Sequence, residues 1–183
     1  CRAPRCGNRA RCGQDFRFQH LTSDDGLSDN AITCVFQDGA GFIWIGTENG
    51  LDRYDGSGVW NVPGTRSHIT AVTGDREGTI WAATKDKGLL RVDPEKGAGR
   101  VFRAGDSTKA PVGSDLLTAL YDLDDTTLLI GARENALFFF DKRTFTCTYW
   151  SDSLDISPAK ARAAPLYEQG WCHAITPLND TLL

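Results

Sequence analysis

Short apolar runs recur along the chain, and each is bounded by glycine, aspartate or asparagine. The runs are rich in valine, isoleucine, threonine, phenylalanine and tryptophan, which favour strands, and none keeps the spacing of an amphipathic helix. Between two such runs, Asn49-Gly50 accepts the positive φ that a tight hairpin requires. The pattern therefore predicts an all-β protein made of consecutive antiparallel strands.

The predicted strands belong to a unit that repeats. The segment ITCVFQDGAGFIWIGTENGLDRYD (Ile32–Asp55) aligns with ITAVTGDREGTIWAATKDKGLLRVD (Ile69–Asp93). A more divergent copy reads LTALYDLDDTTLLIGARENALFFFD (Leu117–Asp141), and a fourth begins at WCHAITPLNDTLL (Trp171–Leu183). Repeats of about 40–50 residues built from short strands are typical of β-propeller blades.

One large apolar position marks the period of the repeat. Trp44 and Trp81 are 37 residues apart, and Leu129 follows Trp81 by 48 residues. Indole rings at this position can fill the space between neighbouring blades. We therefore expect a β-propeller segment of about three four-stranded antiparallel blades plus the start of a fourth, which is an incomplete propeller.

Each copy predicts four strands, and one further strand precedes the first copy, as in propellers whose leading strand completes the last blade. The predicted strands are Phe16–Thr22; Ile32–Gln37, Phe42–Gly46, Leu51–Tyr54 and Val59–Val62; Ile69–Thr73, Ile80–Ala83, Leu89–Val92 and Arg100–Arg103; and Leu117–Asp122, Thr127–Gly131, Leu137–Phe140 and Thr146–Trp150. The predicted domain boundaries are a leader at residues 1–15 and a partial propeller at 16–183, with blades at about 27–64, 65–104 and 114–152 and the start of a fourth at about 170–183.

Aspartates stand at the predicted turns. Asp38 and Asp75 follow the first strand of their copies, where a carboxylate can accept backbone N–H bonds from residues further along the turn. Asp55, Asp93 and Asp141 are expected to do the same after the third strand. The run DLDD (Asp122–Asp125) could be read as part of a calcium loop, but its ligand spacing is incomplete, so a structural turn is favoured.

Composition and charge narrow the function classes. The chain has 183 residues, 40% of them hydrophobic and 24% charged, as in an ordinary globular domain with a core. The net charge is −4 and no basic stripe occurs, so we expect no binding of nucleic acid. No apolar stretch approaches the length of a membrane span. Because the chain begins with Cys1 and ends on apolar residues, we expect a fragment of a longer protein.

The cysteines and histidines do not form a metal-binding pattern. Cys1, Cys6 and Cys12 lie among arginines without the usual zinc spacing, so residues 1–15 are interpreted as a disordered leader or a signal remnant. No nucleophile elbow or phosphate-binding loop occurs either, so no catalytic residue, metal or cofactor is predicted. Other cysteines, expected as small core residues, are Cys34, Cys147 and Cys172; the histidines, without partners at metal spacing, are His20, His68 and His173.

The repeat copies resemble a known family. The string FQHLTSDDGLSDNAITCVFQDGAGFIWIGTENGLDRYDG closely resembles the two-component regulator propeller repeat. The second copy is a good match with Ala82-Ala83 in place of Ile-Gly, the third is a fair match, and the resemblance covers about Phe16–Leu183. It implies the exported sensor region of a bacterial receptor, often a hybrid sensor histidine kinase whose output domains lie further along the full-length chain.

The resemblance also implies location and partners. It implies a periplasmic or other extracytoplasmic segment of an inner-membrane receptor, without catalysis of its own. The implied partners are a small-molecule or oligosaccharide ligand, further propeller blades of the full-length chain, and a second copy in a homodimer. Two alternatives stay open: a propeller enzyme of the lyase or quinoprotein type whose active site lies outside this chain, and a non-catalytic protein-interaction scaffold.

Ligand-binding residues are expected where the copies differ, because shared residues build the blade. The links between blades (Ser23–Asn30, Thr65–His68 and Val112–Asp115) should reach the same rim as the hairpins between second and third strands. Alternatively, these segments are ordinary solvated loops. Trp60 or Trp150 would add an aromatic surface if exposed. The candidate ligand-binding residues are Asn30, Glu48, Asn49, His68, Lys85, Asp86, Arg133, Glu134 and Asn135.

The stretch Ser153–Gly170 interrupts the repeat. We expect a long link between blades with a brief helical turn at Ala159–Ala163, before Pro165.

Overall fold

The computed structural model describes residues 19–104, 112, 114–133 and 137–149, and the backbone of 163–168 and 171–177. Within these ranges the chain is almost entirely β structure, with one 3-10 turn, η1 (Ser23–Asp25), ahead of the strands.

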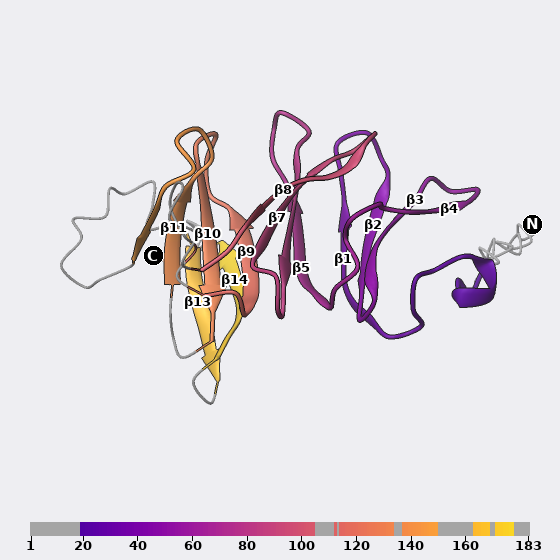
Figure 1. Cartoon of the computed structure of the whole chain (residues 1–183), viewed down its shortest axis with the longest axis horizontal. Coiled ribbons are helices and arrows are strands. Elements are labelled where there is room, and N and C mark those ends of the chain that lie inside the picture. The colour runs from indigo at the N-terminus through magenta and orange to yellow at the C-terminus, as the bar shows by residue number, and fades with distance from the viewer. Residues whose placement is uncertain are drawn as a thin grey trace, which may run out of the picture.

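Three four-stranded antiparallel sheets follow one another across the molecule, from right to left in Figure 1. Their strands pair in chain order, each with its neighbour in sequence. Strand bounds agree closely with those predicted; the largest difference is that β8 begins at Gly97 rather than Arg100. The sheets are β1 (Ile32–Gln37), β2 (Ile43–Thr47), β3 (Gly50–Tyr54) and β4 (Val59–Asn61); β5 (Ile69–Gly74), β6 (Ile80–Thr84), β7 (Leu89–Asp93) and β8 (Gly97–Phe102); and β9 (Leu117–Asp122), β10 (Thr127–Ala132), β11 (Leu137–Asp141) and β12 (Cys147–Tyr149).

The first strands of the three four-stranded sheets lie beside one another. β1 contacts β5, and β5 contacts β9. β9 also contacts β14 (Trp171–Pro177), the second strand of a two-stranded sheet. Sheets that meet through their innermost strands, each strand pairing outward in chain order, form the blades of a propeller. The predicted fold, an incomplete all-β propeller with antiparallel four-stranded blades, is confirmed.

Two sequence predictions at the ends of the repeat region are wrong. Gln19–Thr22, the described part of the predicted leading strand, forms no strand; Phe16, Arg17 and Phe18 lie outside the described residues. A strand needs a partner for its backbone groups, and no described strand pairs with this segment.

The second error concerns the predicted link Ser153–Gly170. Its residues Ala163–Glu168 form β13, which pairs antiparallel with β14 from Ala163↔Pro177 to Glu168↔Trp171. Ala163 therefore belongs to a strand rather than to a helical turn, and the remainder of that predicted turn lies outside the described residues. The local sequence, which has a proline at 165, does not indicate a strand; pairing with β14 stabilises the strand here.

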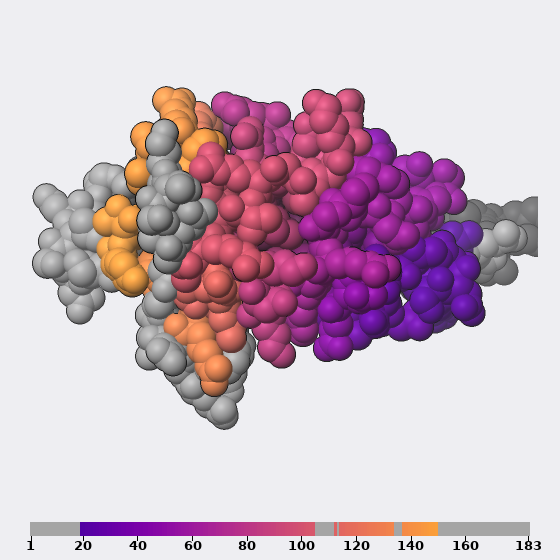
Figure 2. Space-filling model, in the orientation of Figure 1, coloured from indigo at the N-terminus to yellow at the C-terminus, as the bar shows by residue number. Residues whose placement is uncertain are grey.

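Apolar side chains from adjacent blades meet to form the core. Trp44 and Leu51 of the first blade pack with Ile80, Ala82 and Leu90 of the second. Trp81 of the second blade has the same position relative to the third, where it packs with Leu128, Ile130, Phe138 and Phe140. Both indole side chains are fully buried, and side chains close the spaces between the ribbons on the face shown in Figure 2.

The aspartates predicted to start turns do so. Asp38 Oδ1 accepts the backbone N–H groups of Ala40 and Phe42 at 2.9 and 3.0 Å. Asp75 Oδ1 accepts those of Glu77 and Thr79 at 3.0 and 2.9 Å. After the third strands, equivalent bonds go to Asp55, Asp93 and Asp141 from residues two and three positions later.

Cys34 fills a space that a glycine leaves open. A Cβ atom on Gly46 would lie 2.4 Å from Cys34 Sγ and 2.9 Å from Ile69 Cγ2, so the sulfur occupies the missing side chain's place. Burial raises the pKa of the Cys34 thiol, which keeps it protonated. Cys34 and Cys147 are half-buried and packed against the core, as predicted, whereas the side chain of Cys172 lies outside the described residues.

Candidate functional site

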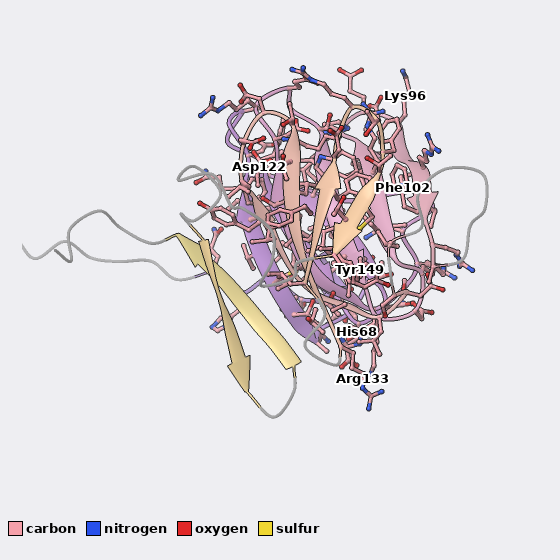
Figure 3. The ribbon with its side chains drawn as sticks, turned by 90° about the vertical axis from the view of Figure 1, so that its left-hand side faces the viewer. His68, Lys96, Phe102, Asp122, Arg133 and Tyr149 are labelled. Carbon is pink, nitrogen blue, oxygen red and sulfur yellow. The ribbon has the colours of Figure 1, made fainter. Side chains whose placement is uncertain are left out.

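The two predicted sets of loops meet at one end of the blades, which we call the lower rim. In each blade a residue just after the second strand donates its backbone N–H to the residue just before the first strand. The three bonds are Glu48 N to Ala31 O (3.1 Å), Lys85 N to His68 O (3.0 Å) and Arg133 N to Leu116 O (3.3 Å). In the view of Figure 3, His68 and Arg133 lie at this rim, and Lys96 and Asp122 lie toward the opposite end, the upper rim.

In the first blade the lower rim is organised around a buried carboxylate, Asp52. Its Oδ2 accepts the Ser28 N–H at 2.8 Å, and its Oδ1 accepts the Ser28 hydroxyl at 2.6 Å and Asn61 Nδ2 at 2.7 Å. Asn61 Nδ2 also donates to Gly26 O at 2.8 Å. The hydrogen bonds of Asp52 and Asn61 therefore connect the link Ser23–Asn30, which precedes the first blade, to β3 and β4. Sequence reasoning missed Asp52, because only burial distinguishes it from a surface aspartate in a strand.

A hollow of about 270 Å³ opens beside this carboxylate on the lower rim. Its polar lining consists of hydroxyl, amide and guanidinium groups, so it offers hydrogen-bond donors and acceptors beside a smaller apolar surface. The lining residues are Ser28, Asn49, Gly50, Asn61, Val62, Pro63, Gly64, Thr65 and Arg66.

In the second blade, hydrogen bonds from side chains of the lower rim hold its loops in place. Lys87 Nζ donates to Arg66 O, and the Ser67 hydroxyl donates to Asp86 Oδ1. The next link is held in the same way, since Ala104 N donates to Asp115 Oδ1 at 2.7 Å. The rim loops are thus anchored to the links that join one blade to the next.

The candidate residues fall into groups with different side-chain partners. Asn30 Oδ1 accepts the Ser23 N–H at 2.7 Å, and Asn49 Nδ2 donates to Ser28 O at 3.3 Å, so both asparagines hold the loop in place.

The remaining candidates lie on the same rim. The side chains of Glu48 and Lys85 are exposed and make no hydrogen bond or ion pair within the described residues. His68 is half-buried, and Arg133 is exposed at the rim. Glu134 and Asn135 lie outside the described residues. The structure therefore brings Asn30, Glu48, Asn49, His68, Lys85, Asp86 and Arg133 to one rim.

Trp60 does not form an open aromatic surface. It is half-buried, packs against the core between the first and second blades, and has the Arg53 guanidinium 4.6 Å from its ring centroid. Arg53 Nη1 donates to Pro94 O of the second blade at 2.6 Å, so this arginine connects the two blades. Trp150 lies outside the described residues.

The DLDD run forms a turn among the described residues. Asp124 Oδ1 accepts the Thr126 N–H and hydroxyl, both at 2.8 Å, and Asp122 Oδ1 pairs with Lys142 Nζ at 2.7 Å. Burial raises the pKa of Asp122, and the bond from Lys142 opposes this shift. No three histidine, cysteine, aspartate or glutamate side chains in the described ranges are grouped as a metal would require. Within the same ranges, no helix is long and apolar enough to cross a bilayer.

A family match covers much of the first blade. Residues 26–49 match the family described as "Two component regulator propeller". A 42-residue segment is 40% identical to Histidine kinase P4 from Formosa agariphila, a segment that makes up 23% of this chain and 3% of the kinase. The predicted resemblance is thereby confirmed for these residues: the chain carries a two-component regulator propeller repeat.

Solved structures share the fold at low sequence identity. One of them is the extracellular domain of a protein described as the hybrid two component system BT4673 from B. thetaiotaomicron. It matches with a TM-score of 0.60 and 17% identity, and the match covers 84% of this chain and 21% of the BT4673 chain. Virginiamycin B lyase from Staphylococcus aureus has a TM-score of 0.54 and 15% identity, over 75% of this chain and 45% of the lyase. The chain thus spans about a fifth of the first structure and less than half of the second.

Proposed function

We propose that this chain is part of the sensor propeller of an extracytoplasmic signal-transduction receptor of the two-component type. The observation that carries the proposal is the match of residues 26–49 to the two-component regulator propeller, a stretch that includes most of the first lower-rim link and the hairpin residues Glu48 and Asn49. We further propose that the lower rim contributes to the ligand site, that oligosaccharides are the ligand class, and that this segment has no catalysis of its own.

The chemistry of the lower rim supports a hydroxyl-rich ligand. The hollow of about 270 Å³ is lined by Ser28, Asn49, Asn61 and Arg66. Amide and hydroxyl groups can donate hydrogen bonds to sugar hydroxyls and also accept them, whereas the guanidinium can only donate. The exposed side chains of Glu48 and Lys85 extend this polar surface. Placed polar groups of this kind can fix the orientation of a polar ligand through hydrogen bonds.

Signal transmission would follow from the way the rim is anchored. Lys87 bonds to Arg66 in the preceding link, and Gly88 N donates to Asp115 O in the next link at 3.0 Å. A ligand that bridges these loops would favour one arrangement of neighbouring blades over another. In the full-length receptor we propose that further blades and a second copy, in a homodimer, carry that change onward, with no nucleic acid bound by this segment.

The proposal is tested in the full-length protein that contains this chain. A glycan array with the ectodomain identifies an oligosaccharide, and calorimetry gives its Kd for three single variants: Asn30→Ala, Lys85→Ala and Arg133→Ala. Loss of a hydrogen-bonding side chain from the site should weaken binding about five- to twentyfold in at least one variant. Lys96→Ala, on the upper rim, is the matched control and should bind like the unmodified protein.

The outcomes separate the alternatives. If all three lower-rim variants keep the Kd and the signalling response of the unmodified receptor, the lower rim is not the site. Capture of a protein partner without any glycan binding would favour the scaffold. Conversion of a bound glycan to product would favour an enzyme.

A further inference from the structure

The upper rim contains a hollow that the proposed ligand site does not use. Its volume is about 560 Å³, and residues of three blades line it: Phe36 from β1, Gly74 from β5 and Asp122 from β9. These residues stand at or near the ends of the three innermost strands, and Figure 3 shows Asp122 on this side of the molecule, away from His68 and Arg133. The hollow therefore lies where the inner strands of successive blades converge.

Apolar side chains make up much of the lining of the hollow. Phe36, Phe42 and Pro94 contribute rings, and most of the exposed lining is apolar. Phe36 holds its position because Gly74 has no side chain: a Cβ atom there would lie 2.8 Å from Phe36 Cε1. An apolar ligand body would exchange water for these surfaces on binding.

Acidic residues also line the hollow. Asp38, Asp75, Glu77 and Asp122 belong to its lining, with Arg76 as the one basic residue. Arg76 is engaged elsewhere, because its Nη1 lies 3.0 Å from Asp125 Oδ1. Asp122 is likewise paired, with Lys142. The negative charge of the lining is thus carried by the other three carboxylates.

Two of these carboxylates keep room for another donor. Asp38 accepts two backbone N–H groups at Oδ1 and Trp44 Nε1 at Oδ2, and Asp75 makes the same three bonds, the last with Trp81. A carboxylate has about four acceptor positions, so each Oδ2 can accept one more bond. Glu77 is exposed, and its side chain makes no hydrogen bond or ion pair within the described residues.

We propose that this hollow binds a small amphipathic cation, an alkyl or aryl ammonium whose apolar body lies on Phe36, Phe42 and Pro94 and whose ammonium group faces Asp38, Asp75 and Glu77. Charge complementarity selects the cation, because the carboxylates of the lining repel an anion and a neutral ligand gains only the apolar contact. The site is separate from the lower rim and does not depend on what that rim binds.

The test uses the full-length protein and 2-phenylethylammonium as the probe, with ligand-observed NMR to measure Kd. 2-Phenylethanol and 3-phenylpropionate are controls with the same ring and a neutral or negative end. The ammonium should bind with a Kd on the order of millimolar, the alcohol about tenfold more weakly, and the carboxylate not detectably. Equal binding of ammonium and alcohol would overturn the proposal.

Variants locate the bound probe. Ala40 lines the hollow with an exposed side chain, so Ala40→Trp should fill the space and abolish binding of the ammonium. Glu77→Gln should raise Kd about three- to fivefold, as expected for loss of one exposed charge contact. Glu95→Gln removes an equal charge from the same rim outside the hollow and should leave Kd unchanged.

The test of ammonium binding is independent of the test of oligosaccharide binding at the lower rim. An unchanged Kd in Ala40→Trp would show that the probe binds elsewhere and the proposal would fail. Lys85→Ala should bind the ammonium normally whether or not it binds an oligosaccharide.

Discussion

Trp44 Nε1 donates a hydrogen bond to Asp38 Oδ2 at 2.8 Å, across the turn that joins β1 to β2. The second blade repeats it, with Trp81 Nε1 2.9 Å from Asp75 Oδ2. Each carboxylate therefore caps the turn with one oxygen and holds the indole with the other. Because the indole fills the space between two blades, this bond connects turn geometry with blade packing.

The third blade has lost both partners together. Leu129 occupies the position of the tryptophan, and the position of the aspartate is held by Leu123, whose N–H bonds to Thr127 O at 3.0 Å as Asp38 N does to Phe42 O. Leu123 packs against the cluster that contains Leu129. With Leu129 in place of tryptophan, there is no indole N–H for a carboxylate to bind. An apolar contact of Leu123 takes the place of that hydrogen bond.

Asp75→Asn should separate the two functions of the carboxylate. The amide oxygen can still accept the N–H groups of Glu77 and Thr79, but the NH₂ group cannot accept the bond from Trp81. The free energy of unfolding should fall by about 1–2 kcal/mol, as for a part-buried hydrogen bond whose donor is left unpaired. Urea unfolding followed by circular dichroism measures it. Asp93→Asn, at a turn aspartate that bonds no indole, is the control, and an equal loss there would contradict the interpretation.

Gly46→Ala should be rescued by Cys34→Ala. The single change places a methyl group against Cys34 Sγ and Ile69 and should cost about 1–3 kcal/mol of stability through overpacking. In the second blade the paired positions are Ala71 and Ala83, so the double variant reproduces a combination that the fold already accepts. Chemical unfolding of both single variants and the double variant gives the coupling. Additive losses would show that the close contact with the sulfur is not the cause.

The turn after β3 should lose stability in acid. Bonds from the backbone N–H groups of Ser57 and Gly58 lower the pKa of Asp55 from 3.8 to about 2. Because the folded pKa lies below the unfolded one, the stabilising contribution is present above about pH 4 and is lost as the pH falls toward 2. Carboxyl-carbon NMR should give a midpoint near pH 2 for Asp55. Asp55→Asn should remove this part of the pH dependence, whereas a midpoint near 3.8 would contradict the geometry.

The purified chain should self-associate through β1. Val35 and Ile32 keep 63% and 45% of their surface exposed on this strand, which is the edge of its sheet. An apolar edge strand is a template for pairing with another chain. Val35→Glu should shift the light-scattering mass toward the monomer with little change in the unfolding midpoint, since its side chain is already in solvent. A monomer in the unmodified chain would refute the prediction.

Local chemistry explains why the strands and turns could be predicted. The short apolar runs, Asn49-Gly50 and the turn aspartates act within a few residues of one another, so the sequence specifies them without reference to the fold. Comparison of the copies aligned one blade with the next, which assigned Trp44 and Trp81 to equivalent buried positions. The same comparison located the lower rim, because loops at equivalent positions of successive blades must lie on the same side.

Long-range pairing explains what could not be predicted. β13 forms because β14 supplies its partner, and Gln19–Thr22 stays without strand structure because no described strand pairs with it. The roles of Asn30 and Asn49 as loop anchors, and of Asp52 as a buried acceptor, depend on residues brought close by folding.

The sequence by itself therefore determined the repeated blade, its strands and its turns, since these follow from short-range periodicity and backbone preference. Only the tertiary structure decided which polar side chains are already bonded and where hollows lie, because both depend on surfaces from different blades. The upper-rim hollow is the clearest case: Phe36, Gly74 and Asp122 are far apart along the chain, and only the packing of β1, β5 and β9 brings them together.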